Sequence, residues 1–123
     1  MKQRETDSPS AVFNPEELLA RLDHDAELLQ DLAAIFKKEF PRSLEDLRRA
    51  VDSKDAKRVA AVAHSLKGML SNLSAAESAG AAARLEQLGR SGEMSGIREA
   101  FALFEEEATK VMPQLEAYLA GVR

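Results

Sequence analysis

The sequence contains no cysteine and no tryptophan, and aromatic residues make up only 5% of its 123 residues. Without cysteine, the chain cannot form disulfides, use a thiolate in catalysis or bind a metal through sulfur. Because aromatic residues are scarce, the core must consist mainly of aliphatic side chains. A chain of this length forms one domain and can bury roughly 65–70% of the surface that its unfolded state exposes.

Long apolar runs and a large excess of one charge are absent as well. No stretch reaches the roughly 18 apolar residues that a membrane-spanning helix needs, and the polar start MKQRETDSPS is unlike a signal peptide. The net charge is −4, with acidic and basic residues interspersed, which argues against nucleic-acid binding. These absences predict a cytoplasmic protein that neither inserts into a membrane nor binds nucleic acid.

The chain does contain helical periodicity along most of its length, and it lacks strand signals. Asn14 is typical of a helix N-cap, Pro15 suits the first helical position, and Glu16 suits the first turn. The preceding residues have no periodicity. We therefore predict a disordered tail or linker over residues 1–12 and a folded domain over residues 13–123.

Two long helices are predicted in the first half of the domain. The first runs from about Asp25 to Ala50, where apolar residues recur at steps of three and four. Pro41 should kink this helix without ending it, because the apolar stripe keeps its phase on both sides. The second helix starts near residues 53–54, after an N-cap at residue 52 or 53, and ends near Leu73.

Two further helices are predicted in the second half. Ser74 and Glu77 have the spacing of a capping box and predict a helix start, and Gly89 is typical of the residue just after a helix end. The last helix covers about residues 94–120 and should bend at Pro113. Long helices, short connections and the lack of strands favour an all-α, up-down helical bundle.

The stretch VAAVAHSLKGMLSNLSA, residues 59–75, predicts a helix with an apolar side that packs in the core and a histidine and a lysine on its other side. At about 100° per residue, His64 points away from the apolar side, which comprises Val59, Val62, Leu66, Met69, Leu70 and Leu73. The residues around His64 on the exposed side are small apart from two lysines: Lys57, Ala60, Ala61, Lys67, Gly68 and Ser71. Elsewhere in this chain, exposed helix faces carry mainly charged side chains.

Gly68 and Lys67 indicate a functional surface around His64. A glycine inside a helix costs about 1 kcal/mol relative to alanine, and Gly68 lies four residues after His64, where a side chain would crowd the imidazole. Lys67, three residues after His64, places an ammonium within reach of anything bound to the ring. An exposed imidazole, a nearby cation and open space suit the acceptance of a phosphoryl group.

The segment AHSLKGMLSNLSA resembles the signature of histidine-containing phosphotransfer (HPt) domains of two-component phosphorelays, A-H-[S/T]-L-K-G followed by small residues and L-G-A. The resemblance extends from VFNPEELLARL through LEQLG to the last helix. It implies an antiparallel four-helix bundle with a short extra helix at the N-terminus. It also implies that His64 accepts the phosphoryl group, that Lys67 stabilises its charge and that Gly68 makes room for the partner.

The same resemblance implies receiver domains as partners, whose aspartates exchange phosphoryl groups with His64. A hybrid sensor histidine kinase is a further expected partner. Alternatively, this chain could be a cytoplasmic part of such a membrane-bound kinase. The receiver would supply the Mg²⁺, so the chain is expected to bind no metal or cofactor of its own. The resemblance also implies a phosphocarrier that has no ATP site, and we expect it to be a monomer. The predicted docking surface comprises Lys57, Ala60, Ala61, Gly68, Met69 and Ser71.

The chain departs from the family pattern after the histidine. Ser74 stands where the L-G-A motif has glycine, so we predict a serine cap in this turn. Met69 is bulkier than the small residue that is common there, and it borders the predicted docking surface. The other histidine, His24, lies between two aspartates, and we interpret this triplet as structural because it is a weak metal motif.

Two other classes of function stay open. A dimerisation and phosphoacceptor segment of a sensor histidine kinase also carries histidine on a helical hairpin. Such segments typically follow the histidine with an acidic residue and a nearby proline, whereas here Ser65 follows His64 and the next proline is Pro113. The remaining alternative is a non-catalytic helical interaction or dimerisation module in which His64 is incidental.

Overall fold

The computed structural model describes residues 12–122, and all regular structure in this range is helical. The helices are α1 (Pro15–Arg21), α2 (Ala26–Asp52), α3 (Ala56–Asn72), α4 (Ala76–Ser91), α5 (Ile97–Ala108) and α6 (Val111–Val122). The predicted all-α fold is confirmed. Residues 1–11 of the predicted tail lie outside the described residues, whereas its last residue, Val12, is buried in the core.

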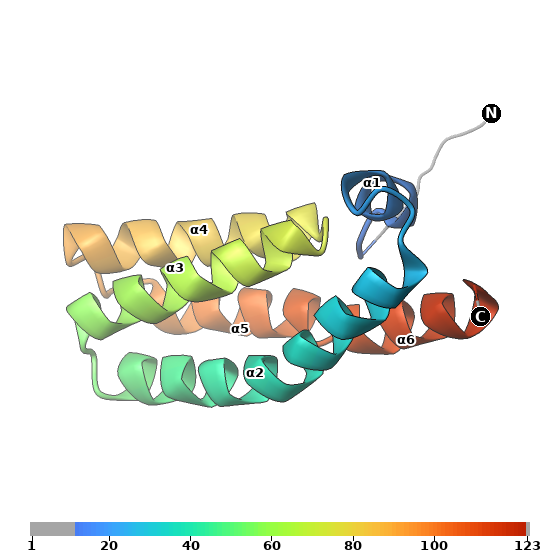
Figure 1. The fold of residues 1–123 in the computed structure, drawn as a ribbon. Helices are drawn as coiled ribbons and strands as arrows, with labels where there is room; N and C mark the ends of the chain where they lie inside the picture. Colours follow the sequence, from blue (N-terminus) through green and yellow to red (C-terminus); the bar gives the residue numbers. More distant parts are fainter. Residues whose placement is uncertain (1–11, 123) are drawn as a thin grey trace.

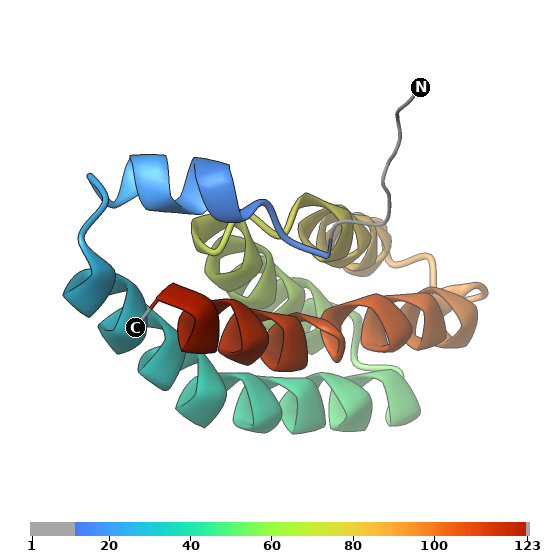
Figure 2. The same cartoon turned by 90° about the vertical axis from the view of Figure 1, so that its right-hand side faces the viewer.

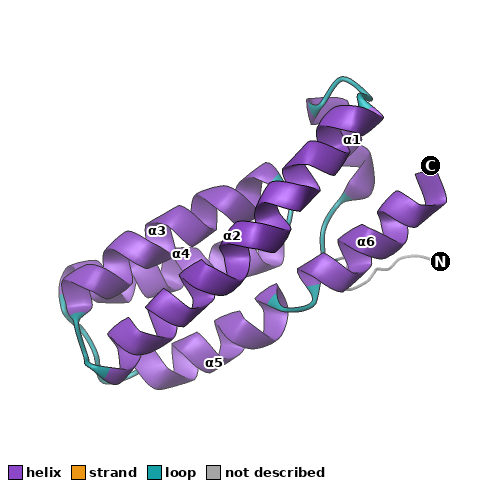
Figure 3. Cartoon of the chain, turned by 60° about the horizontal axis from the view of Figure 1, so that its bottom comes forward, coloured by secondary structure: helices purple, strands orange, loops and turns teal. Residues whose placement is uncertain are grey.

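Four helices form the body of the molecule. α2, α3, α4 and α5 lie side by side, and each runs in the opposite direction to the one before it (Figures 1 and 3). Figure 1 shows α1 end-on at one end of the bundle, so α1 lies across the bundle axis. α6 continues beyond α5 and packs against the first half of α2 (Figure 3). The architecture is thus an antiparallel four-helix bundle with a short additional helix at the N-terminus.

The core is mainly aliphatic, as the composition predicts. Its largest fully buried side chains come from all six helices and from the turn after α3: Leu18, Leu29, Phe36, Leu47, Val51, Leu66, Leu70, Leu73, Leu85, Ile97, Phe104 and Leu115. The rings of Phe36 and Phe40 stack with their centroids 4.9 Å apart. Apolar burial of this kind is the main source of stability in a helical bundle.

The helix starts predicted at Asn14 and Asp25 are correct, whereas the start predicted near residues 53–54 is wrong. The side chain of Asn14 accepts a hydrogen bond from the N–H of Glu17, and Asp25 caps α2 in the same way. α3, however, is capped by Asp55 instead of residue 52 or 53. The chain needs these extra residues to turn between antiparallel helices, and it does so through a left-handed conformation at Lys54 (φ 55°).

α2 is one continuous helix that contains Pro41. Its ribbon is curved along its length (Figure 2). Phe40 and Leu47, on either side of the proline, are both buried, so the packed face continues across it. The prediction that the helix continues through Pro41 is therefore confirmed, whereas the predicted kink at the proline stays a prediction.

The predicted last helix is divided into two. α5 ends at Ala108, α6 begins at Val111, and the hydroxyl of Thr109 donates to the carbonyl of Glu105 at the break. Pro113 then lies in the first turn of α6, where its missing N–H needs no helical partner. The proline thus favours a new helix start, and the prediction of a single bent helix was wrong.

The predicted capping box at Ser74 is also absent. The N-cap of α4 is Ala75, which makes no side-chain capping hydrogen bond. Ser74 instead adopts a left-handed conformation with φ 56° and is buried in the turn between α3 and α4. This backbone conformation favours glycine, which gives a physical reason for glycine at this position in the L-G-A pattern.

α1 is attached to the turn that follows α3. Arg21 Nη1 donates to the carbonyl of Ser71 at 2.7 Å and to Ser74 Oγ at 3.2 Å, and the N–H of Asn14 donates to the carbonyl of Ser74 at 2.9 Å. Arg21 therefore adds a second donor to the Ser71 carbonyl at the C-terminus of α3, which also accepts the N–H of Ser74 at 2.9 Å. Among the helices described here, none combines the length and apolar character that crossing a membrane requires.

Candidate functional site

The orientation of α3 agrees with the predicted apolar stripe. Val59, Leu66, Leu70 and Leu73 are fully buried, whereas Val62 and Met69 are half-buried at its edges. Ala63 is also fully buried, although the stripe read from the sequence did not include it. His64, which follows Ala63, therefore points to the outside of the bundle.

The imidazole of His64 is exposed to solvent, but one of its two nitrogens is hydrogen-bonded to the protein. Its side chain retains 63% of its accessible surface, and Nδ1 lies 3.0 Å from Oε2 of Glu86 on α4. When Glu86 is ionised it can only accept a hydrogen bond, so Nδ1 must carry the proton that faces it. A neutral imidazole in this tautomer has its lone pair on Nε2, which is then the nucleophilic nitrogen.

Glu86 is a buried carboxylate surrounded by cationic side chains. Its side chain is only 7% exposed, and Oε1 lies 2.8 Å from Lys67 Nζ. Oε2 lies 2.6 Å from Arg90 Nη2 and also accepts the hydrogen bond from His64. The hydrogen bond from Lys67 lowers the pKa of Glu86 most, burial opposes this effect, and His64 and Arg90 lower it further. Glu86 is therefore ionised near neutral pH.

Close approach of α3 and α4 brings Glu86 to His64. Gly89 is buried inside α4, and a Cβ atom there would lie 2.7 Å from both the carbonyl oxygen of Ala56 and the backbone nitrogen of Ala60. Only a glycine permits this contact between backbones. The prediction that Gly89 ends the helix was therefore wrong: α4 ends at Ser91, and Gly92 with φ 74° provides the left-handed C-cap.

The predicted docking residues do not all lie on one open surface. Lys57, Ala61, Gly68 and Ser71 are exposed on the same side of α3 as His64, and a Cβ atom on Gly68 would meet no heavy atom within 4 Å. Gly68 is therefore not a helix-packing contact. Ala60 is half-buried and its backbone lies against Gly89, while Met69 is half-buried against the core.

Comparison with known proteins identifies the family. The Hpt domain family matches residues 31–123, which is more than half of the chain. The chain belongs to the Hpt domain family. It is also similar to the crystal structure of histidine-containing phosphotransfer protein B (HptB) from Pseudomonas aeruginosa PAO1, with a TM-score of 0.79 and 26% identity over 94% of this chain and 100% of that chain. A comparison with curated proteins finds no match.

An Hpt domain has a histidine phosphotransfer role in phosphorelays, so the function expected from the sequence is confirmed at the level of the family. Hpt domains carry phosphoryl groups and interact with receiver domains. The geometry around His64 suits this role, because it combines an exposed imidazole with an ionised carboxylate and two nearby cations.

Two residues of this Hpt site were missed from the sequence. Glu86 and Arg90 lie on α4, and both contact the site through the Glu86 carboxylate. A signal was present in the segment around LEQLG, where Glu86 lies three residues before Gly89 and one after the buried Leu85. An acidic residue at such a position on a packed helix needs a cationic partner across the interface.

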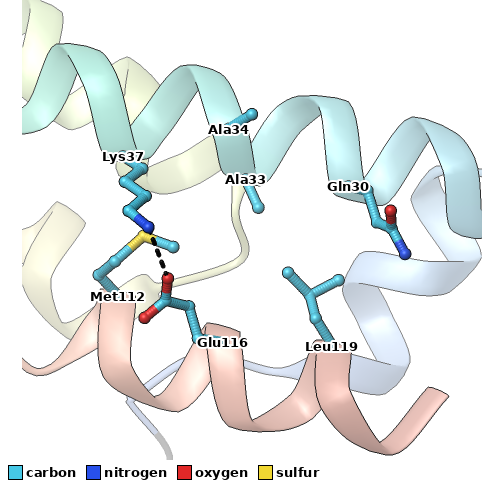
Figure 4. A pocket seen from close by; sticks show the side chains of 7 residues that line it. All are labelled: Gln30, Ala33, Ala34, Lys37, Met112, Glu116 and Leu119. Atoms are coloured by element: carbon cyan, nitrogen blue, oxygen red, sulfur yellow. Dashed lines mark ion pairs between the residues drawn. The ribbon is translucent and has the colours of Figure 1, made fainter. Parts of the chain in front are cut away.

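Other features of the Hpt domain lie apart from this site. Figure 4 shows a pocket between α2 and α6, lined by Gln30, Ala33, Ala34, Lys37, Met112, Glu116 and Leu119, with none of its lining residues on α3 or α4. Lys37 and Glu116 pair across it at 3.2 Å. His24 is exposed in a left-handed turn with φ 61°. Within residues 12–122, no group of three or more histidine or acidic side chains is arranged to hold a metal ion.

Proposed function

We propose that His64 is the residue of this Hpt domain that carries the phosphoryl group. Nε2 attacks the phosphorus of an aspartyl phosphate on a receiver domain, and the N–P bond forms as the P–O bond to the aspartate breaks. The bonding electrons leave with the aspartate as a carboxylate. The reverse reaction with the aspartate of a second receiver passes the group on.

The single observation that supports this role best is the hydrogen bond between Nδ1 of the exposed His64 ring and the buried Glu86. Attack through Nε2 makes the ring cationic while Nδ1 keeps its proton. The ionised Glu86 stabilises that positive charge and fixes the ring orientation, as the carboxylate partner of a catalytic histidine does in serine proteases. Glu86 is therefore proposed as the residue that orients the nucleophile.

Lys67 supplies positive charge for the transferred group. Its ammonium has three N–H donors, and one already bonds to Glu86 Oε1 at 2.8 Å. A flexible side chain one turn after His64 on α3 can turn toward a phosphoryl group on Nε2. The Mg²⁺ that phosphoryl transfer uses would be bound by the receiver, and we propose that this chain neither binds ATP nor phosphorylates itself.

The proposed docking surface for the receiver includes the open side of α3. Gly68 leaves free space one turn from His64, and Ala61 and Ser71 add only small side chains. A receiver must bring its aspartate within bonding distance of Nε2, so any bulk at these positions would oppose the approach. Lys57 adds a positive charge at the edge of this surface.

The surface extends from α3 onto α2 through two apolar residues. Asp46 of α2 pairs with Arg58 of α3 at 3.7 Å, so these two positions lie near each other on the antiparallel helices. The same number of residues, about three turns, separates Asp46 from Ile35 and Arg58 from Met69, so we propose that Ile35 extends the docking surface on the side of Met69. Ile35 is 59% exposed, so its apolar side chain is available for contact with a receiver that docks over α2 and α3.

A label-transfer experiment tests the function. The protein is incubated with ATP and Mg²⁺, and a phosphorylated receiver is then added. We expect no label from ATP alone and rapid label from the receiver, in a form that is labile to acid and stable to alkali. His64→Gln should abolish labelling and change the melting temperature only slightly, because His64 makes no core contact and the glutamine amide can still donate a hydrogen bond to Glu86. Labelling that persists in His64→Gln would exclude His64 as the acceptor, and receiver binding without labelling would favour an interaction module.

A further inference from the structure

The role of Arg90 follows from the arrangement of the charges around Glu86. His64, Lys67 and Arg90 all contact this one buried carboxylate. His64 and Lys67 have roles in the proposed transfer, whereas Arg90 has none. Arg90 lies one turn after Glu86 on α4, and its guanidinium binds Oε2, the same oxygen that accepts the hydrogen bond from His64.

In the proposed function, Lys67 contacts two anionic groups at different times: the Glu86 carboxylate before transfer and the phosphoryl group during transfer. In the structure its ammonium bonds to Glu86 Oε1. During transfer the same ammonium is needed at the phosphoryl group on the other side of the imidazole ring. Movement of Lys67 removes one positive charge from a carboxylate that is only 7% exposed, and a buried charge without compensation is costly.

Arg90 remains on Glu86 when Lys67 moves. Its contact is on Oε2, so it does not depend on the position of Lys67 on Oε1. Because Arg90 and the N–H of His64 both contact Oε2, the carboxylate retains its ion pair with Arg90 and its hydrogen bond to the imidazole. Without Arg90, Lys67 would be the only lysine or arginine side chain within residues 12–122 that pairs with Glu86, and its release would leave the carboxylate without a partner of this kind in that range.

We infer that Arg90 is a positioning residue that keeps Glu86 charged and bound to His64 while Lys67 turns from Glu86 to the phosphoryl group. This inference rests on the proposed function of His64. It deepens that function by assigning two cations to one carboxylate, with one fixed on Oε2 and the other released for the reaction. Arg90 does not touch the reacting atoms.

The inference predicts that the effect of Arg90 depends on the charge at position 86. With Glu86, loss of Arg90 holds Lys67 on the carboxylate and slows transfer. With Gln at position 86 there is no charge to compensate, so loss of Arg90 should have no effect on the rate. An arginine that contacted the receiver directly would affect the rate equally with Glu or Gln at position 86.

The test is a rate comparison in four proteins: wild type, Arg90→Gln, Glu86→Gln and the double variant. Single-turnover transfer from a phosphorylated receiver is measured at saturating receiver. We expect Arg90→Gln to slow transfer about tenfold, which corresponds to a weak charge-assisted hydrogen bond, and the double variant to match Glu86→Gln within about twofold. Arg90→Lys should restore part of the rate. Arg84→Gln removes the same charge from the opposite side of α4 and should leave the rate unchanged.

Two results would overturn the inference. One is a wild-type rate for Arg90→Gln, and the other is an equal slowing by Arg90→Gln in the wild-type and Glu86→Gln proteins. A carboxyl NMR titration of Glu86 provides a test that needs no transfer. The pKa of Glu86 should rise more when Arg90→Gln is added to Lys67→Ala than when Arg84→Gln is added, and equal changes would contradict the inference. Failure of the wild type to accept label would instead reject the proposed function.

Discussion

Gly68 offers the sharpest separation of stability from activity in this protein. It lies in the interior of α3, it is exposed, and a Cβ atom there would meet no heavy atom within 4 Å. Substitution should therefore remove the conformational cost of glycine without introducing a clash. Gly68→Ala should raise the unfolding free energy by about 0.5–1 kcal/mol, which amounts to a rise in melting temperature of several degrees for a domain of this size.

A larger side chain at this position should have opposite effects on stability and transfer. Gly68→Gln should stabilise the helix slightly less than alanine, since glutamine is also a good helix former. Its side chain, however, extends over the space one turn from His64 that the receiver must enter. We expect transfer from a phosphorylated receiver to slow by at least about tenfold, the equivalent of a transition-state penalty of about 1.4 kcal/mol. Thermal melting and single-turnover label transfer measure the two effects.

Gly80 provides a matched control on the neighbouring helix. It lies inside α4, it is exposed, and a Cβ atom there also meets no heavy atom within 4 Å. Gly80→Gln should stabilise the fold by a similar amount and leave transfer unchanged, because it lies about two turns from Glu86 and on another side of α4. Unfolding of Gly68→Gln would show that the glycine is a packing contact. A stable Gly68→Gln that transfers at the wild-type rate would show that the receiver does not approach over α3.

Three further substitutions test the remaining parts of the site. Lys67→Ala should slow transfer or shorten the lifetime of the phosphohistidine, and it should lower the unfolding free energy by roughly 1 kcal/mol because Glu86 loses one hydrogen bond; an unchanged rate and lifetime would reject its role. Because the pKa of Glu86 is lowered in the folded state, the ionised Glu86 stabilises the fold at pH values above 4.5, the ordinary pKa of glutamate, and this contribution is lost as the pH falls below that value. Denaturant titrations should therefore show less acid destabilisation in Glu86→Gln than in wild type. Ile35→Lys should weaken receiver binding in a calorimetric titration, while Leu103→Lys, at a position of similar exposure on α5, should not; equal affinities for both variants would place Ile35 outside the docking surface.

The sequence predicted the helices better than it predicted their ends. Apolar stripes at steps of three and four depend only on one helix and its buried face, so they located α2 and α3 and the outward direction of His64. Helix ends depend on tertiary contacts as well. Ser74 and Gly89 have the local properties of a cap and a stop, yet packing between α3 and α4 uses Ser74 in a left-handed turn and Gly89 inside a helix.

The same distinction explains which site residues could be predicted. His64, Lys67 and Gly68 lie within five residues on one helix, so their spacing alone places them on one side of it. Glu86 and Arg90 lie on a different helix, and their contact with His64 depends on how α3 and α4 are aligned. Periodicity within each helix does not determine that alignment, so the position of Glu86 on the packed side of its helix can suggest burial but does not identify His64 as its partner.

The alignment of α3 and α4 links the stability of the fold to the chemistry of the site. Gly89 and Ala60 allow the two backbones to approach closely, and Glu86 lies one turn before Gly89, at the height of His64. At a greater separation of the helices, the Glu86 carboxylate would lose its hydrogen bond with Nδ1 and water would enter the space between them. The imidazole could then rotate and either nitrogen could carry the proton, so a smaller fraction of the molecules would present a nucleophilic Nε2. Small residues that contact no reacting atom therefore contribute to phosphoryl transfer, because they keep the buried carboxylate within reach of the exposed histidine.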